Sequence, residues 1–557
     1  MTQLTRKDAL AQLTAKGMDY EISEQLIDDV PIRTFVNAPR SLRQLFTDTR
    51  SDETFFVYED ERYTFNEMYQ LAAKLATQLK EKYGVVKGDR VAISMRNYPE
   101  WVAAFMASTS IGAIAVAMNA WWESDEIAQG LEDCGAKVML ADQERLDRLA
   151  QIEGLTTEVI AVRPQGTDYL GIEFNELLSN LTNVEMPDVD VGPEDPATMF
   201  YTSGSTGFPK GALANQRNII SALLSWELDA QSALLIAGIE APQLDYQPAT
   251  LLAVPLFHAT GSHAVYLASY RAQRKVVAMY KWDPHAAAAL IEAEQIASFI
   301  APAAMTGDLV QAAASSDRDL STLLSVGGGG APRAPEQVKD IDDAFATAQP
   351  GTGWGMTETN AIGTGIAGQD YLDRPASSGR ASAVLDLKVV DDEGRELPQG
   401  ERGELMIRGA SVISGYWRRP EANAETFNQG WMKTGDVAYF DEEGFVFIVD
   451  RIKDLIIRGG ENIGCGEVEA ALLEHPAVLE ASVYAIPDER LGEEVATTIY
   501  CDGSIDEAQL REFLAERLAK FKIPRYIQFS DEHLPRIASG KIFKRQLRDD
   551  AIAAQAN

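Results

Sequence analysis

Cysteine and histidine are scarce in this 557-residue sequence, which contains three cysteines and five histidines. Cys134, Cys465 and Cys501 are too few and too scattered for a disulfide framework or a zinc site, and such scarcity is typical of a reducing compartment. The first 25 residues have no apolar core followed by small residues, which argues against a signal peptide. We therefore expect a cytoplasmic protein.

Basic residues are also few, because 50 lysines and arginines stand against 84 acidic residues and leave a formal net charge of −34. A negative field repels polyanions. The net charge therefore argues against binding by charge attraction to nucleic acid or to an anionic lipid surface. The surplus of acidic residues is interpreted as an adaptation of the protein surface to solubility or to salt. An anionic ligand would need a local positive patch of its own.

One stretch without a charged residue, WVAAFMASTSIGAIAVAMNAWW at 101–122, imitates a membrane span. It is rich in small residues and contains Asn119, so its mean hydropathy is low for a helix that faces lipid. A buried helix, a turn at Gly112 and a strand explain it better. We expect no integral membrane association.

The apolar content of 46% and the chain length favour two or more domains. Strand-like runs such as 90–94 and 137–140 alternate with helical stretches such as 66–82, which is typical of α/β layers. Hairpin signals follow from about Asp386, and after Arg451 a helix, two strands and a helix form a compact unit. The predicted fold is α/β, with a large multi-subdomain N-terminal domain (1–450) and a small C-terminal α+β domain (451–557).

The stretch YTSGSTGFPKG at 201–211 predicts a phosphate-binding loop. Its glycines allow tight turns, its hydroxyls add donors, and Lys210 adds a cation, although a plain surface loop is the alternative. It is not a Walker loop, because Lys210 follows Pro209 and precedes Gly211. GTGWGM at 351–356 fails the dinucleotide pattern, since its glycines are spaced two and two.

YTSGSTGFPKG resembles the signature of the adenylate-forming superfamily, which includes acyl-CoA synthetases, aryl-CoA ligases, luciferases and peptide-synthetase adenylation domains. Six further stretches match that family in order and span nearly the whole chain. They are PLFH (255–258), GGGGAP (327–332), GWGMTET (353–359), TGD (434–436), DRIKDLIIRGGENI (450–463) and PRIASGK (535–541).

The resemblance implies two half-reactions that use ATP, Mg²⁺ and CoA. A carboxylate attacks the α-phosphorus to give an acyl-adenylate and pyrophosphate, and the thiol of CoA then displaces AMP. The first step brings two anions together, so its catalysis is mostly positioning and charge neutralisation.

By the same resemblance, the β- and γ-phosphates are held by Thr202, Ser203, Gly204, Ser205, Thr206, Gly207 and Lys210. Thr357 contacts the α-phosphate, and Glu358 holds Mg²⁺ with Thr206. Adenine lies between Trp354, with Gly355 beside it, and the segment Gly330, Ala331 and Pro332, while Asp436 and Arg451 bind the ribose.

The resemblance also implies that the small domain is mobile and turns about Lys453 between the two steps. Lys541 bridges the attacking carboxylate and the α-phosphate during adenylation, and Gly459 and Gly460 later let the CoA arm pass close to the backbone. The family commonly has a proline where this chain reads Gly464-Cys465-Gly466. This departure leaves the position of the CoA loop open.

The acid is predicted to be a medium- or long-chain fatty acid or a similarly apolar acid. By the resemblance, His258 lies at the pocket mouth without the aspartate typical of amino-acid substrates. Gly355 stands where acetate-specific relatives carry a tryptophan that closes the pocket, so it is expected to leave room for a longer or bulkier acyl group, and Gly327 to Gly330 are expected to add space. The alternatives are an adenylate-forming ligase that serves a carrier protein, and an aryl or other specialised CoA ligase. Chain length and aromatic preference stay open.

Two further expectations concern partners. The spacing from Pro535 to Gly540-Lys541 matches that at which some acyl-CoA synthetases are modified, so a lysine acetyltransferase acting on Lys541 is a hypothesis. Residues 221–250 are expected to shape the acyl site or an oligomer contact, and a homodimer is the expected assembly.

Overall fold

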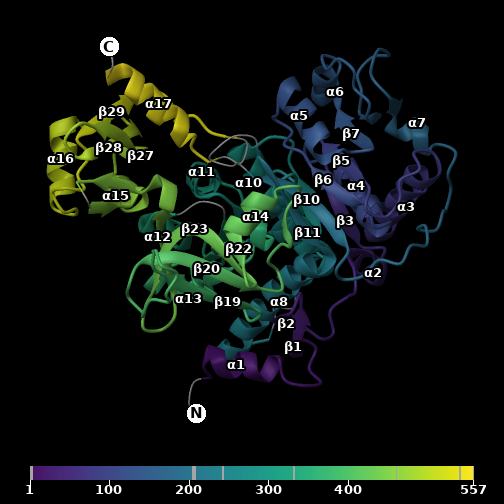
Figure 1. Ribbon diagram of the computed structural model, residues 1–557, viewed down its shortest axis with the longest axis horizontal. Helices are drawn as coiled ribbons and strands as arrows, with labels where there is room; N and C mark the ends of the chain where they lie inside the picture. Colours follow the sequence, from purple (N-terminus) through teal and green to yellow (C-terminus); the bar gives the residue numbers. More distant parts are fainter. Residues whose placement is uncertain are drawn as a thin grey trace.

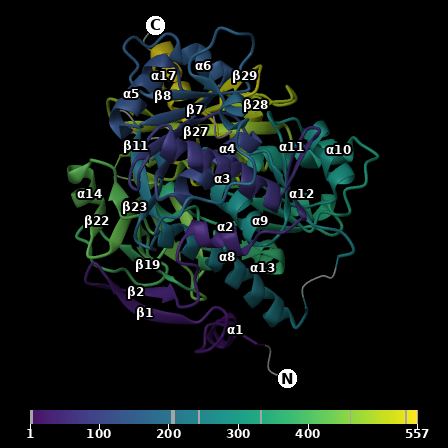
Figure 2. The same cartoon turned by 90° about the vertical axis from the view of Figure 1, so that its right-hand side faces the viewer.

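The computed structural model describes residues 4–202, 209–240, 244–329, 333–459, 461–537 and 541–555. A large α/β body carries a small C-terminal unit at one end (Figure 1). The N-terminal helix α1 (Arg6–Leu13) and the hairpin of β1 (Ile22–Ile27) and β2 (Val30–Phe35) lie at the opposite end, as Figure 2 shows from the side. The predicted fold class is confirmed.

One sheet of the large body has eight strands and is mainly parallel, except where β11 runs antiparallel to β10 and β21. Strand β5 has the bounds of the predicted run 90–94. Strand β7 begins at Val138, one residue later than the predicted run 137–140. In sheet order the strands are β21 (Gly415–Tyr416), β11 (Lys210–Asn215), β10 (Pro196–Thr202), β6 (Ile114–Ala117), β5 (Arg90–Ser94), β7 (Val138–Asp142), β8 (Glu158–Val162) and β9 (Ile172–Glu173).

The second sheet has nine strands, and its central strands are parallel. In sheet order they are β18 (Arg380–Ala381), β17 (Thr364–Ala367), β16 (Gln349–Thr352), β15 (Ser325–Gly328), β14 (Ile296–Ala301), β12 (Ala249–Leu252), β13 (Lys275–Ala278), β3 (Thr54–Tyr58) and β4 (Glu61–Thr64).

Successive side chains of a strand point to opposite sides of the sheet. Because the strands carry apolar side chains on both sides, helices cover both faces. In β5, Val91 and Ile93 face the large core cluster, which includes α3 (Phe65–Glu81) and α4 (Pro99–Ser110), while Ala92 faces the cluster of α5 (Ser124–Cys134) and α6 (Gln143–Leu149). The other helices of the body are α2 (Leu42–Asp48), α7 (Phe174–Leu178), α9 (Ala268–Arg271), α10 (Pro284–Glu294), α11 (Ala303–Ala314), α12 (Pro335–Ala344), α13 (Gly368–Asp373) and α14 (Pro420–Thr426).

The charge-free stretch folds as predicted, into a buried helix, a turn and a strand. Every residue of α4 is buried, Gly112 has a φ of 71° at the turn, and β6 follows. Among the described residues, one helix, α8 (Gln216–Ala237), has the length and the apolar composition needed to cross a membrane. Its buried residues, including Ile219, Leu223 and Leu228, and its contacts with α1 and the π-helix η1 (Thr260–Leu267) place it in the core.

A third sheet leads to the C-terminal unit. It contains β19 (Leu385–Val390), β20 (Gly403–Gly409), β23 (Trp431–Phe440), β22 (Phe427–Asn428) and β24 (Val446–Arg451), and a turn at Gly444 joins β23 to β24 in the region where hairpins are predicted. The chain leaves this sheet at Arg451 and passes through the 3₁₀ turn η3 (Ile452–Asp454).

The C-terminal unit has its own sheet and its own core cluster. Its elements are β25 (Ile456–Arg458), β26 (Glu461–Ile463), α15 (Cys465–Leu473), β27 (Val478–Asp488), β28 (Gly492–Cys501), α16 (Glu507–Ala515), β29 (Tyr526–Ser530) and α17 (Lys544–Gln555). The predicted order of helix, strand, strand and helix is present in α15, β27, β28 and α16. The division at 450/451 itself stays a prediction.

Candidate functional site

The predicted phosphate loop joins two antiparallel neighbours, β10 and β11. Thr202 ends β10 and Lys210 begins β11, and the two residues are register partners. The Thr202 hydroxyl donates to the Lys210 carbonyl at 3.3 Å. Because β10 also runs parallel to β6, Thr202 lies at the carboxyl edge of this sheet, where α/β proteins bind their ligands. Both described ends of the loop are therefore held together by strand pairing.

Glu358 lies close to the same loop. It belongs to the 3₁₀ turn η2 (Thr357–Thr359), is buried, and its Oε1 accepts a hydrogen bond from the Tyr416 hydroxyl at 2.8 Å. The Lys210 ammonium lies 4.3 Å from the centre of the Tyr416 ring. The sequence predicts roles for Lys210 and Glu358 but none for Tyr416. Tyr416 lies in the short strand β21, which pairs with β11.

A second cluster joins the residues predicted to hold the nucleoside. The Trp354 indole donates to Asp436 Oδ2 at 2.7 Å, and Arg451 Nε lies 2.7 Å from Asp436 Oδ1. Asp436 and Arg451 are register partners on β23 and β24. Burial raises the pKa of Asp436, and the charge of Arg451 opposes that shift. The residues predicted to bind the base and the sugar of a nucleoside are therefore in contact with one another.

The segment from Trp354 to Asn360 connects the two clusters. Asn360 and Ala361 have φ values of 58° and 66°, and the side-chain Nδ2 of Asn360 donates to the Ser411 carbonyl at 2.8 Å. The Ile413 amide donates to the Glu358 carbonyl at 2.9 Å. Within the described part of the chain, no hydrogen bond reaches the hydroxyl of Thr357, so this hydroxyl is available to a phosphate.

Lys541 acts electrostatically on residues of the large body although it follows the last strand of the small one. Desolvation and the positive charge of Arg451 lower the pKa of Lys541, and Asp436 opposes them. Burial and the charge of Lys541 together lower the pKa of His258 to about 4. The structure therefore brings Lys541, Arg451, Asp436 and His258 together in one arrangement of the two domains.

The hinge segment departs from the family pattern in a way that adds a contact. Lys453 is exposed in η3. The Cys465 amide, which a proline would lack, donates to the Asp450 carboxylate, and the Cys465 thiol donates to the Asp454 carbonyl at 3.1 Å. A Cβ on Gly464 would lie 3.2 Å from the Val449 carbonyl oxygen. The first turn of α15 therefore packs closely on the end of β24.

The CoA loop is only partly described. Gly459 has a φ of 61°, and its amide donates to the Leu491 carbonyl at 2.8 Å. This positive φ explains why glycine stands there. Gly460 lies outside the described residues. So do Ser203, Gly204, Ser205, Thr206, Gly207, Gly330, Ala331 and Pro332, whose assignments stay predictions.

Gly355 has a different role from the one expected. A Cβ on Gly355 would lie 2.5 Å from the Ala361 carbonyl oxygen, so the backbone of Ala361 fills the space of a side chain. The expectation that Gly355 opens room for an acyl group is wrong. Gly329 does border space: among the described residues, its Cβ would meet only the Thr260 methyl, at 3.9 Å.

The residues present fit a magnesium ion that arrives with a nucleotide. Mg²⁺ is commonly bound through one or two carboxylates, with phosphate oxygens and water completing its shell. Glu358 supplies one buried carboxylate, and its Oε1 is held by Tyr416. In the described ranges, its Oε2 has no hydrogen-bond partner and is the oxygen available to a cation.

Two buried histidines make the stability of the large domain depend on pH. Burial lowers the pKa of His263 to about 3, and that of His258 to about 4, against about 6.5 in an unfolded chain. Between pH 6.5 and 4 the unfolded state binds more protons, so the free energy of unfolding falls as the pH falls. Each histidine contributes up to about 1.4 kcal/mol per pH unit.

We expect His263→Gln to flatten this dependence by about 1 kcal/mol per pH unit, as measured by urea unfolding at several pH values from 7 to 5. The exposed His285 offers a matched control, and His285→Gln should keep the wild-type slope. Equal slopes for wild type and His263→Gln would contradict the buried, neutral state of His263.

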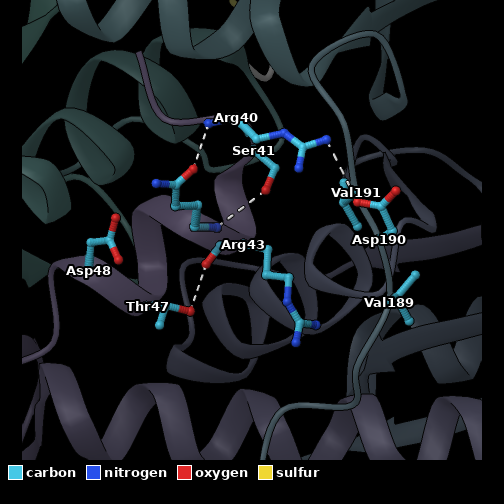
Figure 3. A pocket seen from close by; sticks show the side chains of 9 residues that line it. Arg40, Ser41, Arg43, Thr47, Asp48, Val189, Asp190 and Val191 are labelled. Carbon is cyan, nitrogen blue, oxygen red and sulfur yellow. Dashed lines mark hydrogen bonds and ion pairs between the residues drawn. The ribbon is translucent and has the colours of Figure 1, made fainter. Parts of the chain in front are cut away.

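A surface cavity of about 240 Å³ lies away from these clusters, between α2 and residues 189–191 (Figure 3). Its arginines are already engaged. Arg40 lies 3.7 Å from Asp190, and Arg43 donates to the Ser110 carbonyl at 3.1 Å. None of the predicted site residues lines it, so we assign it no ligand.

Comparison with known families matches the chain over both parts. A family model described as AMP-binding enzyme matches residues 44–417, and one described as AMP-binding enzyme C-terminal domain matches residues 467–541. Similar proteins include a long-chain-fatty-acid–CoA ligase from Mycobacterium tuberculosis, 31% identical over 89% of this chain and 94% of that protein. A feruloyl-CoA synthase from an Amycolatopsis species is 34% identical over 87% of this chain and 93% of that protein.

Solved structures agree with this result. The o-succinylbenzoate CoA synthetase of Bacillus subtilis, in complex with its acyl-adenylate intermediate, has a TM-score of 0.78 at 29% identity and covers 92% of this chain and 98% of its own. The same enzyme has been solved with ATP and a magnesium ion, with a TM-score of 0.77 at 29% identity, over 92% of this chain and 100% of its own. An anthranilate CoA ligase with anthranoyl-AMP has a TM-score of 0.83 at 25% identity, over 93% of this chain and 98% of its own.

Proposed function

The chain belongs to the AMP-binding enzyme family, and on that premise we propose that its acid is a medium- or long-chain fatty acid or a similarly apolar acid. The reaction itself follows from the family. The enzyme is an AMP-forming acid–thiol ligase that uses ATP, Mg²⁺ and CoA, makes an acyl-adenylate with release of pyrophosphate, and then forms the CoA thioester with release of AMP.

The observation that supports our residue assignments is the grouping of Lys541 with Arg451, Asp436 and His258. In the proposed adenylation step, the carboxylate of the acid attacks the α-phosphorus and the bond to pyrophosphate breaks. Lys541 would contact both the incoming carboxylate oxygen and the α-phosphate, where negative charge gathers. Fixed cations in a site that excludes water stabilise such charge far better than cations in solution.

The remaining groups of the site would bind and orient. Asp436 would accept hydrogen bonds from the ribose hydroxyls while Arg451 and Trp354 hold its carboxylate in place. Lys210 would hold the outer phosphates at the end of β10. Bound Mg²⁺, held by Glu358, would neutralise part of the phosphate charge.

The proposed acid class is supported by the apolar surroundings of the predicted acyl site. His258 stays neutral near pH 7 because burial and Lys541 lower its pKa to about 4, so it offers no charge to a second carboxylate. The neighbouring glycines border the Thr260 methyl and the side chain of Ile300, at 3.9 Å from a Cβ on Gly329 and 3.2 Å from one on Gly327. Both contacts are apolar.

An aryl acid is the second candidate. The relatives include a feruloyl-CoA synthase and CoA ligases named for 4-coumarate and 2-succinylbenzoate.

We expect an acid panel to separate these candidates, with AMP release measured in the presence of CoA. Octanoate and palmitate test the first candidate, and ferulate and benzoate test the second. Malonate and glycine should react at least about 100-fold more slowly, because a second charge would be left unpaired in an apolar site. Faster turnover of malonate or glycine than of every apolar acid would contradict the proposed class.

Three further properties are proposals that separate experiments address. A cytoplasmic location is tested by cell fractionation, and a homodimer by light scattering on the purified chain. Acetylation of Lys541 is tested by mass spectrometry after incubation with a lysine acetyltransferase, and an unmodified Lys541 with full activity would dispose of it.

A further inference from the structure

Tyr416 lies between two charged groups that the proposed function assigns to Mg²⁺ and ATP. Its hydroxyl donates to Glu358 Oε1 at 2.8 Å, and the face of its ring carries the Lys210 ammonium at 4.3 Å from the centroid. One side chain thus touches both the carboxylate that would hold the metal and the lysine at the end of the phosphate loop. These two groups belong to segments almost 150 residues apart in the chain.

The backbone of Tyr416 is fixed on two sides. Tyr416 pairs with Ala212 of β11, two residues beyond Lys210. On its other side the Asn423 side chain accepts from the Tyr416 amide at 2.7 Å and donates to the Tyr416 carbonyl at 3.0 Å. The Asn423 side chain therefore pairs with both backbone groups of Tyr416, as a neighbouring strand would. Glu358 is thus bonded to a side chain whose backbone is held on both sides.

The hydroxyl of Tyr416 donates to a carboxylate oxygen, and hydrogen bonds to a charged acceptor are shorter and stronger than those between neutral groups.

We propose that Tyr416 is a positioning residue that fixes Glu358 and Lys210 relative to each other, so that metal and phosphates are bound as one unit. The hydroxyl keeps Oε1 occupied and leaves Oε2 as the oxygen that would bind a cation. The ring holds the Lys210 ammonium above its negative face, which attracts cations, and so keeps it near the loop. This role rests on the proposed assignment of Glu358 to Mg²⁺ and of Lys210 to the phosphates.

Two substitutions separate the contributions of hydroxyl and ring. Tyr416→Phe removes the bond to Glu358 and keeps the ring under Lys210. Tyr416→Leu removes both. Tyr270→Phe is the matched control, because the buried Tyr270 hydroxyl donates to the Phe46 carbonyl at 3.1 Å, in the core of the same domain and away from the predicted site residues.

The test measures ATP binding without acid, by calorimetry, once with saturating Mg²⁺ and once with a chelator. The ratio of the two dissociation constants is the coupling between metal and nucleotide. We expect Tyr416→Phe to reduce this ratio about tenfold while the affinity in chelator changes less than about twofold. Tyr416→Leu should also weaken binding in chelator, by about threefold or more. Tyr270→Phe should match the wild type.

A merely structural role for Tyr416 would lower the melting temperature and leave the coupling ratio unchanged. An unchanged ratio in Tyr416→Phe, with a wild type that binds ATP more tightly in Mg²⁺, would overturn the positioning role and leave the proposed function intact. A wild type that binds ATP no better with Mg²⁺ than without it would overturn both.

Discussion

Replacing Lys541 with alanine is expected to abolish acyl-adenylate formation and largely spare thioester formation from supplied acyl-AMP. In the described arrangement the Lys541 charge acts on Asp436, which is predicted to bind the ribose, and on His258, which is predicted to lie at the mouth of the acid pocket. Removing one such fixed donor typically costs about 10²–10³ in rate. We expect a loss at the upper end or beyond, because the attacking group and its target are both anions.

The two half-reactions of Lys541→Ala can be measured separately, the first by acid-dependent exchange between pyrophosphate and ATP and the second by CoA consumption from synthetic acyl-AMP. Arg545→Ala is the matched control, since Arg545 is a cation at the start of α17 with a side chain 76% exposed. It should leave both steps unchanged. Equal loss of both steps in Lys541→Ala would remove the proposed role.

The opposite pattern is expected for the hinge. Lys453→Pro fixes φ at one position of η3 and restricts the residue before it, so it should slow the proposed turn of the small domain before the thioester step. We expect the thioester rate to fall about 100-fold. Exchange between pyrophosphate and ATP should fall much less.

Lys453→Ala is the control for this variant, because it removes the charge and keeps the freedom of the backbone. The Cys465–Asp450 hydrogen bond joins the first turn of α15 to the end of β24 across Lys453, so a turn about that residue would break it. An unchanged thioester rate in Lys453→Pro would show that the domain does not turn at this residue.

Much of this fold could be predicted from sequence because local signals agreed with tertiary structure. The helix predicted at 66–82 is α3, which begins at Phe65 after the N-cap residue Thr64, and Thr64 and Glu67 exchange hydrogen bonds in a capping box. The stretch at 101–122 was correctly separated from a membrane span because small residues mark a helix packed inside a protein. Both predictions depend on patterns within about twenty residues.

The candidate site could be predicted only as far as motifs reach. Glu358, Lys210, Asp436 and Arg451 stand in recognisable motifs, and the structure brings them together in two clusters. Tyr416 was missed, since its contacts with Lys210 and Glu358 come from strand pairing between distant segments.

Gly355 was misread for a related reason. Its missing side chain suggested empty space, and only the fold shows that the backbone of Ala361 fills it.

The central claim is that the acyl-adenylate forms first and that CoA consumes it. The most direct test is a single-turnover reaction of the wild-type enzyme with Mg²⁺, ATP and the best acid of the panel, quenched before and after CoA is added and analysed by mass spectrometry. We predict enzyme-bound acyl-AMP in an amount close to one per active site before CoA, and its complete conversion to acyl-CoA and AMP afterwards. Acyl-CoA formation without any prior acyl-AMP, or acyl-AMP that persists when CoA is added, would contradict the account.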